Sequence, residues 1–157
     1  MSATEVTTTV GTMSVSNEGL LAWVREMAAM CGPDRVVWVD GSAAEKERLT
    51  AQAVAEGVLT PLDPAKRPGC YYARSNPNDV ARVEHLTFIC TPTKDEAGPT
   101  NNWMAPDEAY AKLRGLFAGA MKGRTMYVIP YAMGPIGSPY AKIGIELTDS
   151  IYVVLNM

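Results

Sequence analysis

The C-terminal run of residues 123–157 constrains the fold more than any other part of the chain. Residues 125–129 and 151–155 are rich in β-branched and aromatic side chains. In residues 142–148 between them, apolar side chains alternate with glycine and glutamate. This composition and this period of two predict three strands. The Gly- and Pro-rich segment 133–139 predicts a connecting loop of defined shape, because its two glycines and two prolines are too closely spaced for a helix or a central strand.

The last of these predicted strands is apolar at Val153, Val154 and Leu155, and the sequence ends at Met157. An unprotected apolar edge strand is a liability that complete domains usually cover. One interpretation is therefore that the chain is the front part of something larger. The other is that the last strand lies in the middle of a finished sheet, and the pattern by itself favours neither.

The N-terminal half predicts two helices with a strand between them. Asn17 can cap a helix whose apolar residues recur at helical spacing. Residues 35–40 then predict a strand. Ser42 and Glu45 have the spacing of a capping box, in which the serine oxygen accepts from an amide three residues on and the glutamate reaches back. We expect this second helix to run to about residue 56.

The elements that follow are shorter or more often interrupted. The charged residues 45–48 are expected to form a solvated face of the second helix. Short strands are predicted at residues 70–73 and 87–90, with the turn-rich loop 74–84 between them. Pro106 is expected in the first turn of a third helix. Strands interleaved with helices predict the α/β class, with a mixed sheet flanked by helices, because several links between strands are too short for parallel crossovers.

Length and composition are typical of one soluble globular domain. The chain has 157 residues, 47% hydrophobic and 20% charged, with a formal net charge of -3 and a pI of about 5.2. Residues 1–16 are predicted to be a flexible leader and residues 17–157 the domain. The charge balance does not favour nucleic acid, the apolar runs are too short for a membrane span, and the N-terminus lacks the pattern of a secretory signal. We therefore expect a cytoplasmic protein without a nucleic-acid or membrane partner.

Few side chains indicate chemistry by themselves. Cys31, Cys70 and Cys90 are an odd number of cysteines at wide spacing, and we expect buried, reduced thiols with no zinc site built from them. His85 is the only histidine, and a lone histidine after a turn is seldom catalytic. The sequence holds no phosphate-binding loop of the form Gly-x-x-x-x-Gly-Lys-Ser/Thr.

Three longer motifs follow one another along the chain. They are Asn-Asp-Val-Ala-Arg-Val-Glu at 78–84, Asp-Glu-Ala-Gly-Pro-Thr-Asn-Asn-Trp at 95–103, and a C-terminal run that includes Gly-Arg-Thr-Met-Tyr-Val-Ile-Pro at 123–130, Met-Gly-Pro-Ile-Gly-Ser-Pro at 133–139 and Lys-Ile-Gly-Ile-Glu-Leu-Thr-Asp-Ser at 142–150. Together they closely resemble the N-terminal domain of GTP-dependent phosphoenolpyruvate carboxykinases, the second being of the bacterial type. The resemblance extends from about Trp23 to the end of the chain and covers well under half of such an enzyme. It implies that residues 17–157 form an incomplete N-terminal domain.

The resemblance also implies roles for two residues of the first motif. In the carboxykinases, the arginine of this motif binds the carboxylate of oxaloacetate or phosphoenolpyruvate, and by position it is Arg82. A guanidinium suits this role because its planar fork can hold an oxyanion bidentately. Glu84 is similar to the family residue associated with closure of the active-site lid, or it orients Arg82. Without the resemblance, Arg82 would be interpreted as a member of a solvated ion pair. His85 departs from the serine or similar residue that the resemblance leads us to expect here in many relatives.

The reaction that the resemblance implies converts oxaloacetate and GTP into phosphoenolpyruvate, GDP and carbon dioxide, and opens gluconeogenesis. Manganese stabilises the enolate that decarboxylation leaves, and GTP supplies the phosphoryl group. In the family, the phosphate loop, the metal ligands and the guanine pocket lie beyond the part that this chain resembles. We therefore expect the chain alone to bind neither GTP nor manganese, to be inactive, and to need the remainder of the enzyme. The alternative is a stand-alone module that binds a small dicarboxylate or assembles with a separate chain carrying the kinase half.

Overall fold

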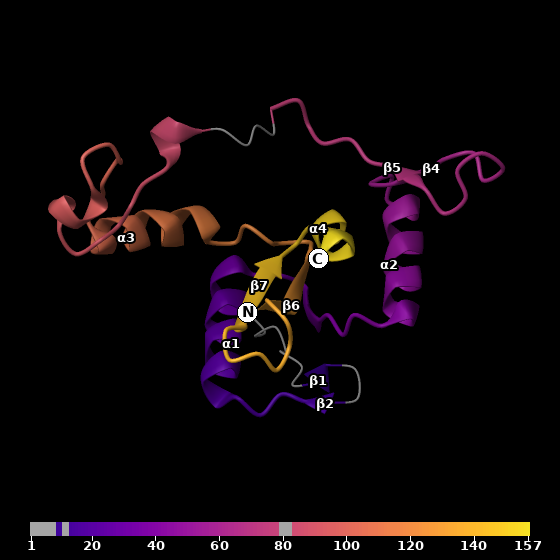
Figure 1. Cartoon of the computed structure of the whole chain (residues 1–157), viewed down its shortest axis with the longest axis horizontal. Coiled ribbons are helices and arrows are strands. Elements are labelled where there is room, and N and C mark those ends of the chain that lie inside the picture. The colour runs from indigo at the N-terminus through magenta and orange to yellow at the C-terminus, as the bar shows by residue number, and fades with distance from the viewer. Residues whose placement is uncertain (1–8, 11–12, 79–82) are drawn as a thin grey trace. The chain divides into compact units, whose positions relative to one another are not determined.

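The computed structural model describes residues 9–10, 13–78 and 83–157 (Figure 1). The chain divides into two compact units. Unit 1 comprises residues 1–74 and 119–157, and unit 2 comprises residues 75–118. Unit 1 contains the central sheet, whereas unit 2 spans the positions of the first and the second motif.

The core of unit 1 is a three-stranded mixed sheet in the order β3-β6-β7. The strand β3 (Arg35–Trp38) runs parallel to β6 (Thr125–Met133), and β7 (Lys142–Thr148) runs antiparallel to β6. This arrangement confirms the predicted α/β class with a mixed sheet, and also confirms the strands predicted at 125–129 and 142–148. The first of those two is longer than predicted and continues to Met133.

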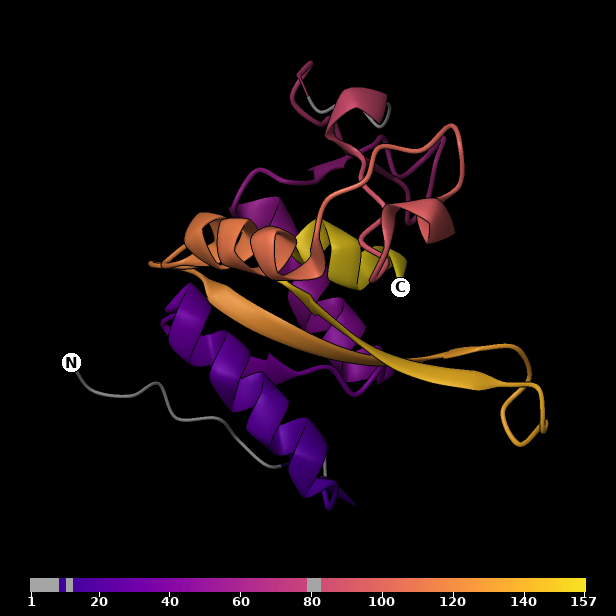
Figure 2. The same ribbon diagram turned by 90° about the vertical axis from the view of Figure 1, so that its left-hand side faces the viewer.

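Helices cover both faces of this sheet (Figure 2). The helix α1 (Glu18–Cys31) packs on one face, in a buried apolar cluster that includes Val128 of β6. On the other face, α2 (Ala43–Ala55) and α4 (Ile151–Asn156) share a second cluster with Ile129. Successive side chains of a strand point to opposite faces, so β6 contributes to both clusters and joins the two helical layers.

The side-chain cap hydrogen bonds predicted for Asn17 and Ser42 at the starts of the first two helices are confirmed. The Oδ1 atom of Asn17 accepts the backbone N–H of Leu20 at 3.0 Å at the start of α1. Gly32 ends this helix with a φ of 65°, a left-handed conformation that glycine adopts without a steric penalty. At the start of α2, the Oγ atom of Ser42 accepts the N–H of Glu45 at 3.1 Å.

Pro130 lies inside β6, where a proline would usually break the ladder. The carbonyl oxygen of Val128 accepts the N–H of Val39 at 2.9 Å, so the backbone groups of residue 128, and of residue 130 after it, face the β3 side. Because the pairing with β3 ends where Trp38 lies opposite Val128, none of the described strands lies where it could accept an N–H from residue 130. The proline is therefore tolerated.

The distal half of the β6–β7 hairpin extends beyond α1 and α2 (Figure 2). Residues 134–141 connect the two strands, which confirms the shaped connection predicted from the glycines and prolines of this segment. In the hairpin, Tyr131 lies directly opposite Gly144. A Cβ atom at position 144 would be 2.5 Å from the Tyr131 hydroxyl oxygen, so the ring covers the glycine.

The predicted strand at 151–155 is wrong, because these residues form α4. The Oγ atom of Ser150 accepts the N–H of Val153 at 3.4 Å and so caps the helix. Ile151 and Val154 are three residues apart, and on a helix this spacing places both side chains in the second cluster. The β-branched composition favoured a strand, but the cap and one-sided burial decide the conformation.

Two other predicted strands are reduced or absent. Within residues 70–73 only β5 (Tyr71–Tyr72) forms, and it pairs antiparallel with β4 (Thr60–Pro61) in a separate two-stranded sheet. The strand predicted at 87–90 is wrong, because this segment makes only a single bridge, between Ile89 and Trp103. Turns or short 3-10 helices lie close on both sides of each segment, which leaves little room for a longer ladder.

At the N-terminus, β1 (Thr9–Val10) pairs antiparallel with β2 (Met13–Ser14), and Val15 packs against the first cluster. The boundary between leader and domain at residue 16 stays a prediction. Unit 2 contains two short 3-10 helices, η1 (Glu84–Leu86) and η2 (Lys94–Ala97). It also contains α3 (Pro106–Phe117), which has Pro106 in its first turn as predicted.

We predict that Gly144→Ala destabilises the chain by about 1–3 kcal/mol, because the added methyl group must displace the ring of Tyr131. Urea unfolding of the variant measures this change. In a Tyr131→Ala background the same substitution is expected to be neutral or stabilising, since the obstacle is gone and alanine is favoured over glycine in a strand. An equal cost in both backgrounds would contradict this account.

Candidate functional site

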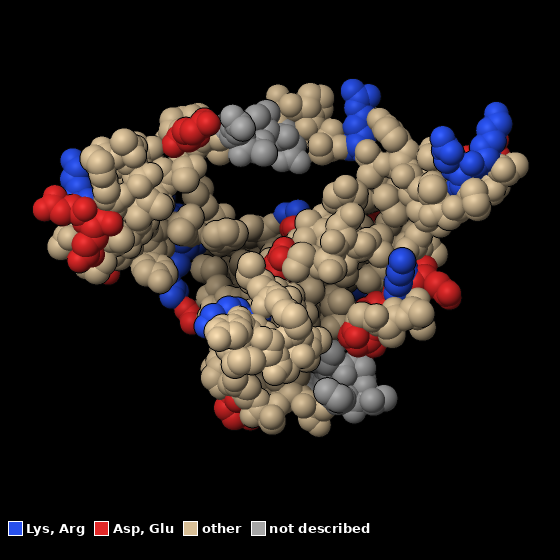
Figure 3. Space-filling model, in the orientation of Figure 1, with Lys and Arg blue, Asp and Glu red and all other residues tan. Residues whose placement is uncertain are grey.

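Charges of both signs are distributed over the molecule. Lys and Arg side chains lie interspersed with Asp and Glu on the face shown in Figure 3. Among the residues that the structure describes, no three His, Cys, Asp or Glu side chains lie close enough together to hold a metal ion. No helix in this described part is long and apolar enough to cross a membrane. The polar groupings that remain are a loop in unit 2, a turn after β3, and a cavity in unit 1.

The loop in unit 2 carries the first motif. Residues 79–82 lie outside the described residues, so the structure gives no position for Arg82. Immediately before them, the Oδ1 atom of Asn76 accepts the N–H of Asn78 at 2.8 Å, which confirms the side-chain turn predicted here. Glu84 is the first residue of η1, and its side chain is exposed. His85 follows in the same short helix and is also exposed.

Asn102 anchors the backbone that follows Arg82. Its Nδ2 atom donates to the carbonyl oxygen of Glu84 at 2.9 Å and to that of Thr87 at 3.2 Å. The backbone carbonyl oxygen of Asn102 accepts the N–H of Ile89 at 2.8 Å. One asparagine therefore joins two segments of the loop that are fifteen or more residues apart in the sequence, and it fixes the backbone of Glu84.

Trp103 adds a further contact between the same segments, because its indole Nε1 donates to the carbonyl oxygen of Thr91 at 3.0 Å. By contrast, the Nδ2 atom of Asn101 donates to the carbonyl oxygen of Ala97, within its own turn, at 2.6 Å. Sequence reasoning missed the role of Asn102. The available signal was its place in the second motif, next to a tryptophan that needs a partner for its N–H.

We predict that Asn102→Ala loosens the segment after Arg82. Removal of two hydrogen bonds worth about 1 kcal/mol each should speed hydrogen exchange at the amides of Leu86 and Thr87 by roughly 5- to 30-fold. Asn101→Ala is the matched control, since it removes the same side chain one residue earlier and should leave those two amides unchanged. Equal effects of the two substitutions would show that Asn102 does not anchor this segment.

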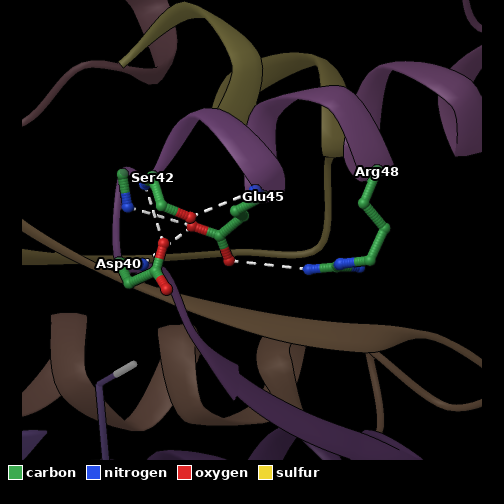
Figure 4. Close-up of polar contacts among 5 residues, drawn as sticks. Asp40, Ser42, Glu45 and Arg48 are labelled. Atoms are coloured by element: carbon green, nitrogen blue, oxygen red, sulfur yellow. Dashed lines mark hydrogen bonds and ion pairs between the residues drawn. The ribbon is translucent and has the colours of Figure 1, made fainter. Parts of the chain in front are cut away.

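In the turn between β3 and α2, the carboxylate of Glu45 binds the backbone (Figure 4). Its Oε2 atom accepts the N–H groups of Asp40 at 2.8 Å and Gly41 at 3.0 Å, and its Oε1 atom lies 3.5 Å from Nη2 of Arg48. Glu45 is only 9% exposed, so the prediction that it belongs to a solvated face is wrong. A carboxylate that accepts two backbone N–H groups is held inward by them.

Asp40 completes this turn from the other side. Its Oδ1 atom accepts the backbone N–H of Ser42 at 2.8 Å. This backbone hydrogen bond, followed by one from the Ser42 hydroxyl, holds the pKa of the Asp40 carboxyl below its usual value. The carboxylate of Glu45 therefore reaches Asp40 and Gly41 in place of the Ser42 amide that a standard capping box would use. Because its polar groups bond one another, the turn is structural.

We predict that Glu45→Ala destabilises the chain by about 1–3 kcal/mol, because the N–H groups of Asp40 and Gly41 lose their acceptor. Glu47→Ala is the control on the same helix, where the side chain is exposed and the expected change is within about 0.5 kcal/mol. Denaturant unfolding of both variants makes the comparison. A loss for Glu45→Ala no larger than that for Glu47→Ala would mean that the carboxylate does not hold the turn.

A cavity of about 400 Å³ lies in unit 1, beside the first residues of β3 and β6. Its lining includes two cations and two anions, Arg35, Arg124, Glu56 and Asp149. The Nη1 atom of Arg124 lies 2.6 Å from Oδ2 of Asp149. The charges of this pair offset one another, which leaves Arg35 and Glu56 as the remaining ionic groups of the lining.

Two further observations weigh against this cavity as the main site. Arg35 donates from Nη2 to the Oγ1 atom of Thr125 at 3.0 Å, and these two residues are the first of two parallel strands. Ligands of open α/β sheets bind at the carboxyl ends of the parallel strands, and the cavity is at their amino ends. Burial, with the charge of Glu56 adding to it, raises the pKa of the lining residue Tyr127. A phenol is neutral near pH 7 even without this shift, so Tyr127 adds no charge to the cavity.

The three cysteines are all free thiols. Cys31 is buried in the first cluster, and this burial raises the pKa of its thiol. Cys70 and Cys90 are exposed, so the expectation of burial is wrong for these two. A buried thiol with a raised pKa is a poor nucleophile, which leaves Cys31 a packing residue.

A mixed sheet between helical layers, together with a polar loop that Asn102 anchors, defines an α/β domain whose candidate site is a loop. The chain matches the family described as the phosphoenolpyruvate carboxykinase N-terminal domain over residues 22–157. It therefore belongs to that family, and the resemblance found in the sequence is confirmed.

Curated relatives are named as GTP-dependent phosphoenolpyruvate carboxykinases. One from Anaeromyxobacter dehalogenans (strain 2CP-C) is 70% identical over 142 residues, which are 90% of this chain and 24% of the relative. One from Neocallimastix frontalis is 56% identical over 144 residues, covering 92% of this chain and 24% of the relative. One from Corynebacterium kroppenstedtii is 52% identical over 157 residues, all of this chain and 25% of the relative. The chain thus spans about a quarter of the length of these relatives.

Proposed function

We propose that this chain acts as the N-terminal part of a GTP-dependent phosphoenolpyruvate carboxykinase, which converts oxaloacetate and GTP into phosphoenolpyruvate, GDP and carbon dioxide. The observation that carries the proposal is the identity of 70% over 142 residues with a relative of that name. The proposal includes a cytoplasmic location and a role in gluconeogenesis.

In this proposal, Arg82 binds the carboxylate of oxaloacetate or phosphoenolpyruvate. Its place in the motif Asp-Val-Ala-Arg-Val-Glu supports the assignment, and the geometry of a guanidinium fits a carboxylate through two parallel hydrogen bonds. The hydrogen bond from Asn102 that holds the backbone of Glu84 adds support, because it fixes the end of the same motif. A site whose backbone is fixed before substrate arrives loses less entropy on binding.

Glu84 is proposed as the second functional residue of the loop. Its carboxylate is exposed and makes no hydrogen bond or ion pair with any other described residue. It is therefore available to orient Arg82 or to contact a closing lid.

GTP and manganese are proposed to bind the remainder of the enzyme, which would supply phosphoryl transfer and stabilise the enolate. The chain alone is accordingly expected to be inactive.

The test joins this chain to the residues that follow the matched segment in the Anaeromyxobacter dehalogenans relative, and measures phosphoenolpyruvate formation from oxaloacetate with GTP and manganese. We expect turnover by the fusion and none by the chain alone. In the fusion, Arg82→Ala should lower kcat/KM by roughly 30-fold or more, equivalent to about 2 kcal/mol of lost carboxylate binding. Arg74→Ala removes an exposed arginine from the same loop and should change kcat/KM little.

Three outcomes would contradict the proposal. Turnover by the chain alone, abolished by Arg82→Ala, would place the phosphate and metal chemistry within these residues. An active fusion that is indifferent to Arg82→Ala would remove the arginine from the substrate site. Oxaloacetate binding by the chain alone, with no turnover on fusion, would favour the alternative of a stand-alone dicarboxylate-binding module.

A further inference from the structure

We propose that the free edge of β7 pairs with a further β-strand supplied by the part of the carboxykinase polypeptide outside this chain. The inference rests on the proposed function, because it requires that the chain belongs to the longer enzyme. It goes beyond that function by assigning the surface through which the two parts join, and the backbone groups that make the contact.

One hydrogen bond shows to which side the backbone N–H and C=O groups of each β7 residue point. The carbonyl oxygen of Val128 accepts from the N–H of Val39, so the backbone groups of Val128 face β3 and away from β7. Leu147 lies opposite Val128. In an antiparallel pair of this kind, the N–H and C=O groups of both residues point outward. Those of Leu147 therefore point to the free edge of the sheet.

Backbone direction alternates along a strand, so Ile145 and Ile143 present their N–H and C=O groups at the same edge as Leu147. No described strand receives them, because the sheet ends at β7. The other two pairs of strands, β1-β2 and β4-β5, form sheets of their own. Three consecutive outward positions of β7 are thus unpaired within the described part of the chain.

The side chains of these positions are apolar. Ile145 and Leu147 pack partly against the first cluster, and Ile143 extends the same face of the sheet while 82% exposed. Natural edge strands are usually protected by charge, by proline or by shortness. The outer edge of β3 has that protection, because the strand is only four residues long. The edge of β7 is seven residues long and contains no proline, and its two charged residues, Lys142 and Glu146, are at positions whose backbone groups face β6 rather than the free edge.

The tip of the same hairpin is also apolar and exposed. The exposed fractions are 66% for Met133, 91% for Ile136 and 87% for Tyr140. An apolar surface continuous with an open strand edge is typical of an interface. Because the matched relatives carry this segment as about a quarter of one polypeptide, the missing strand is proposed to come from the remaining length. Covalent connection gives that strand a higher effective concentration than a second copy of the chain would have.

Residue-resolved hydrogen exchange tests the proposal in the same fusion. In the chain alone, the amides of Gly144 and Glu146 face β6 and should exchange slowly, whereas those of Ile143, Ile145 and Leu147 should exchange quickly. In the fusion, these last three should slow by roughly tenfold or more, because each gains an acceptor. Fast exchange at the three amides in a fusion that still protects Gly144 and Glu146 would overturn the proposal.

A pair of substitutions at one position separates backbone pairing from apolar contact. In the fusion, Ile143→Pro removes an outward N–H as Pro130 does naturally on β6, and should abolish the added protection at Ile145 and Leu147. Ile143→Thr keeps the N–H and the β-branched shape and should retain that protection. Full protection in the proline variant would mean that no strand pairs there. Protection in the chain alone that rises with its concentration would assign the edge to a second copy, and would also overturn the proposal.

The failure of this inference can be distinguished from the failure of the proposed function. A fusion that forms phosphoenolpyruvate but leaves the three amides in fast exchange keeps the function and removes the strand pairing. A fusion whose three edge amides are protected but which forms no phosphoenolpyruvate keeps the strand pairing and contradicts the proposed function. If the fusion leaves Gly144 and Glu146 unprotected, the intact Anaeromyxobacter dehalogenans relative, measured at the aligned positions, decides by the same criterion.

Discussion

Burial of β6 between two helical layers is the interaction on which the rest of unit 1 depends. Met126 and Val128 are fully buried toward α1, while Tyr127 and Ile129, each 4% exposed, pack toward α2 and α4. Burial of one such side chain contributes about 1.5–3 kcal/mol, so these four residues contribute more than any polar contact in the unit. The caps and the turn after β3 orient helices whose place this strand determines. The same strand carries the hairpin to which we assign the interface with the rest of the enzyme.

Unit 2 is held together in a different way. Its buried apolar residues among those described are small, Ala97 and Ala109, so it has little core of its own. Hydrogen bonds from Asn102 and Trp103 connect its segments instead. A loop stabilised by a few polar contacts can adjust its backbone more readily than a packed strand can. This property suits a segment proposed to meet a substrate and a moving lid.

Two of the differences between the predicted and the observed structure share one cause. A strand was predicted at 151–155 because Ile, Tyr and Val favour strands, yet the segment is a helix because Ser150 caps it and residues three apart are buried together. Glu45 was assigned to a solvated face because it lies in a charged run, yet it is buried because two backbone N–H groups need its carboxylate. In both places a contact with another segment or turn overrides the local preference of the residue, and such contacts leave little trace in composition.

The sequence by itself determined the family, the α/β class, the helix caps at Asn17 and Ser42 and the hairpin around residues 134–141, because each depends on a local pattern or on a long motif. It also singled out Arg82 and Glu84 through the motif that contains them. Only the tertiary structure decided which edge of the sheet is open, how Asn102 anchors the loop, and which N–H groups the Glu45 carboxylate accepts. The first two features depend on backbone groups brought together from distant parts of the chain, and the third on the path of the turn before the helix. The direction in which a backbone N–H points is not encoded in the residue that carries it.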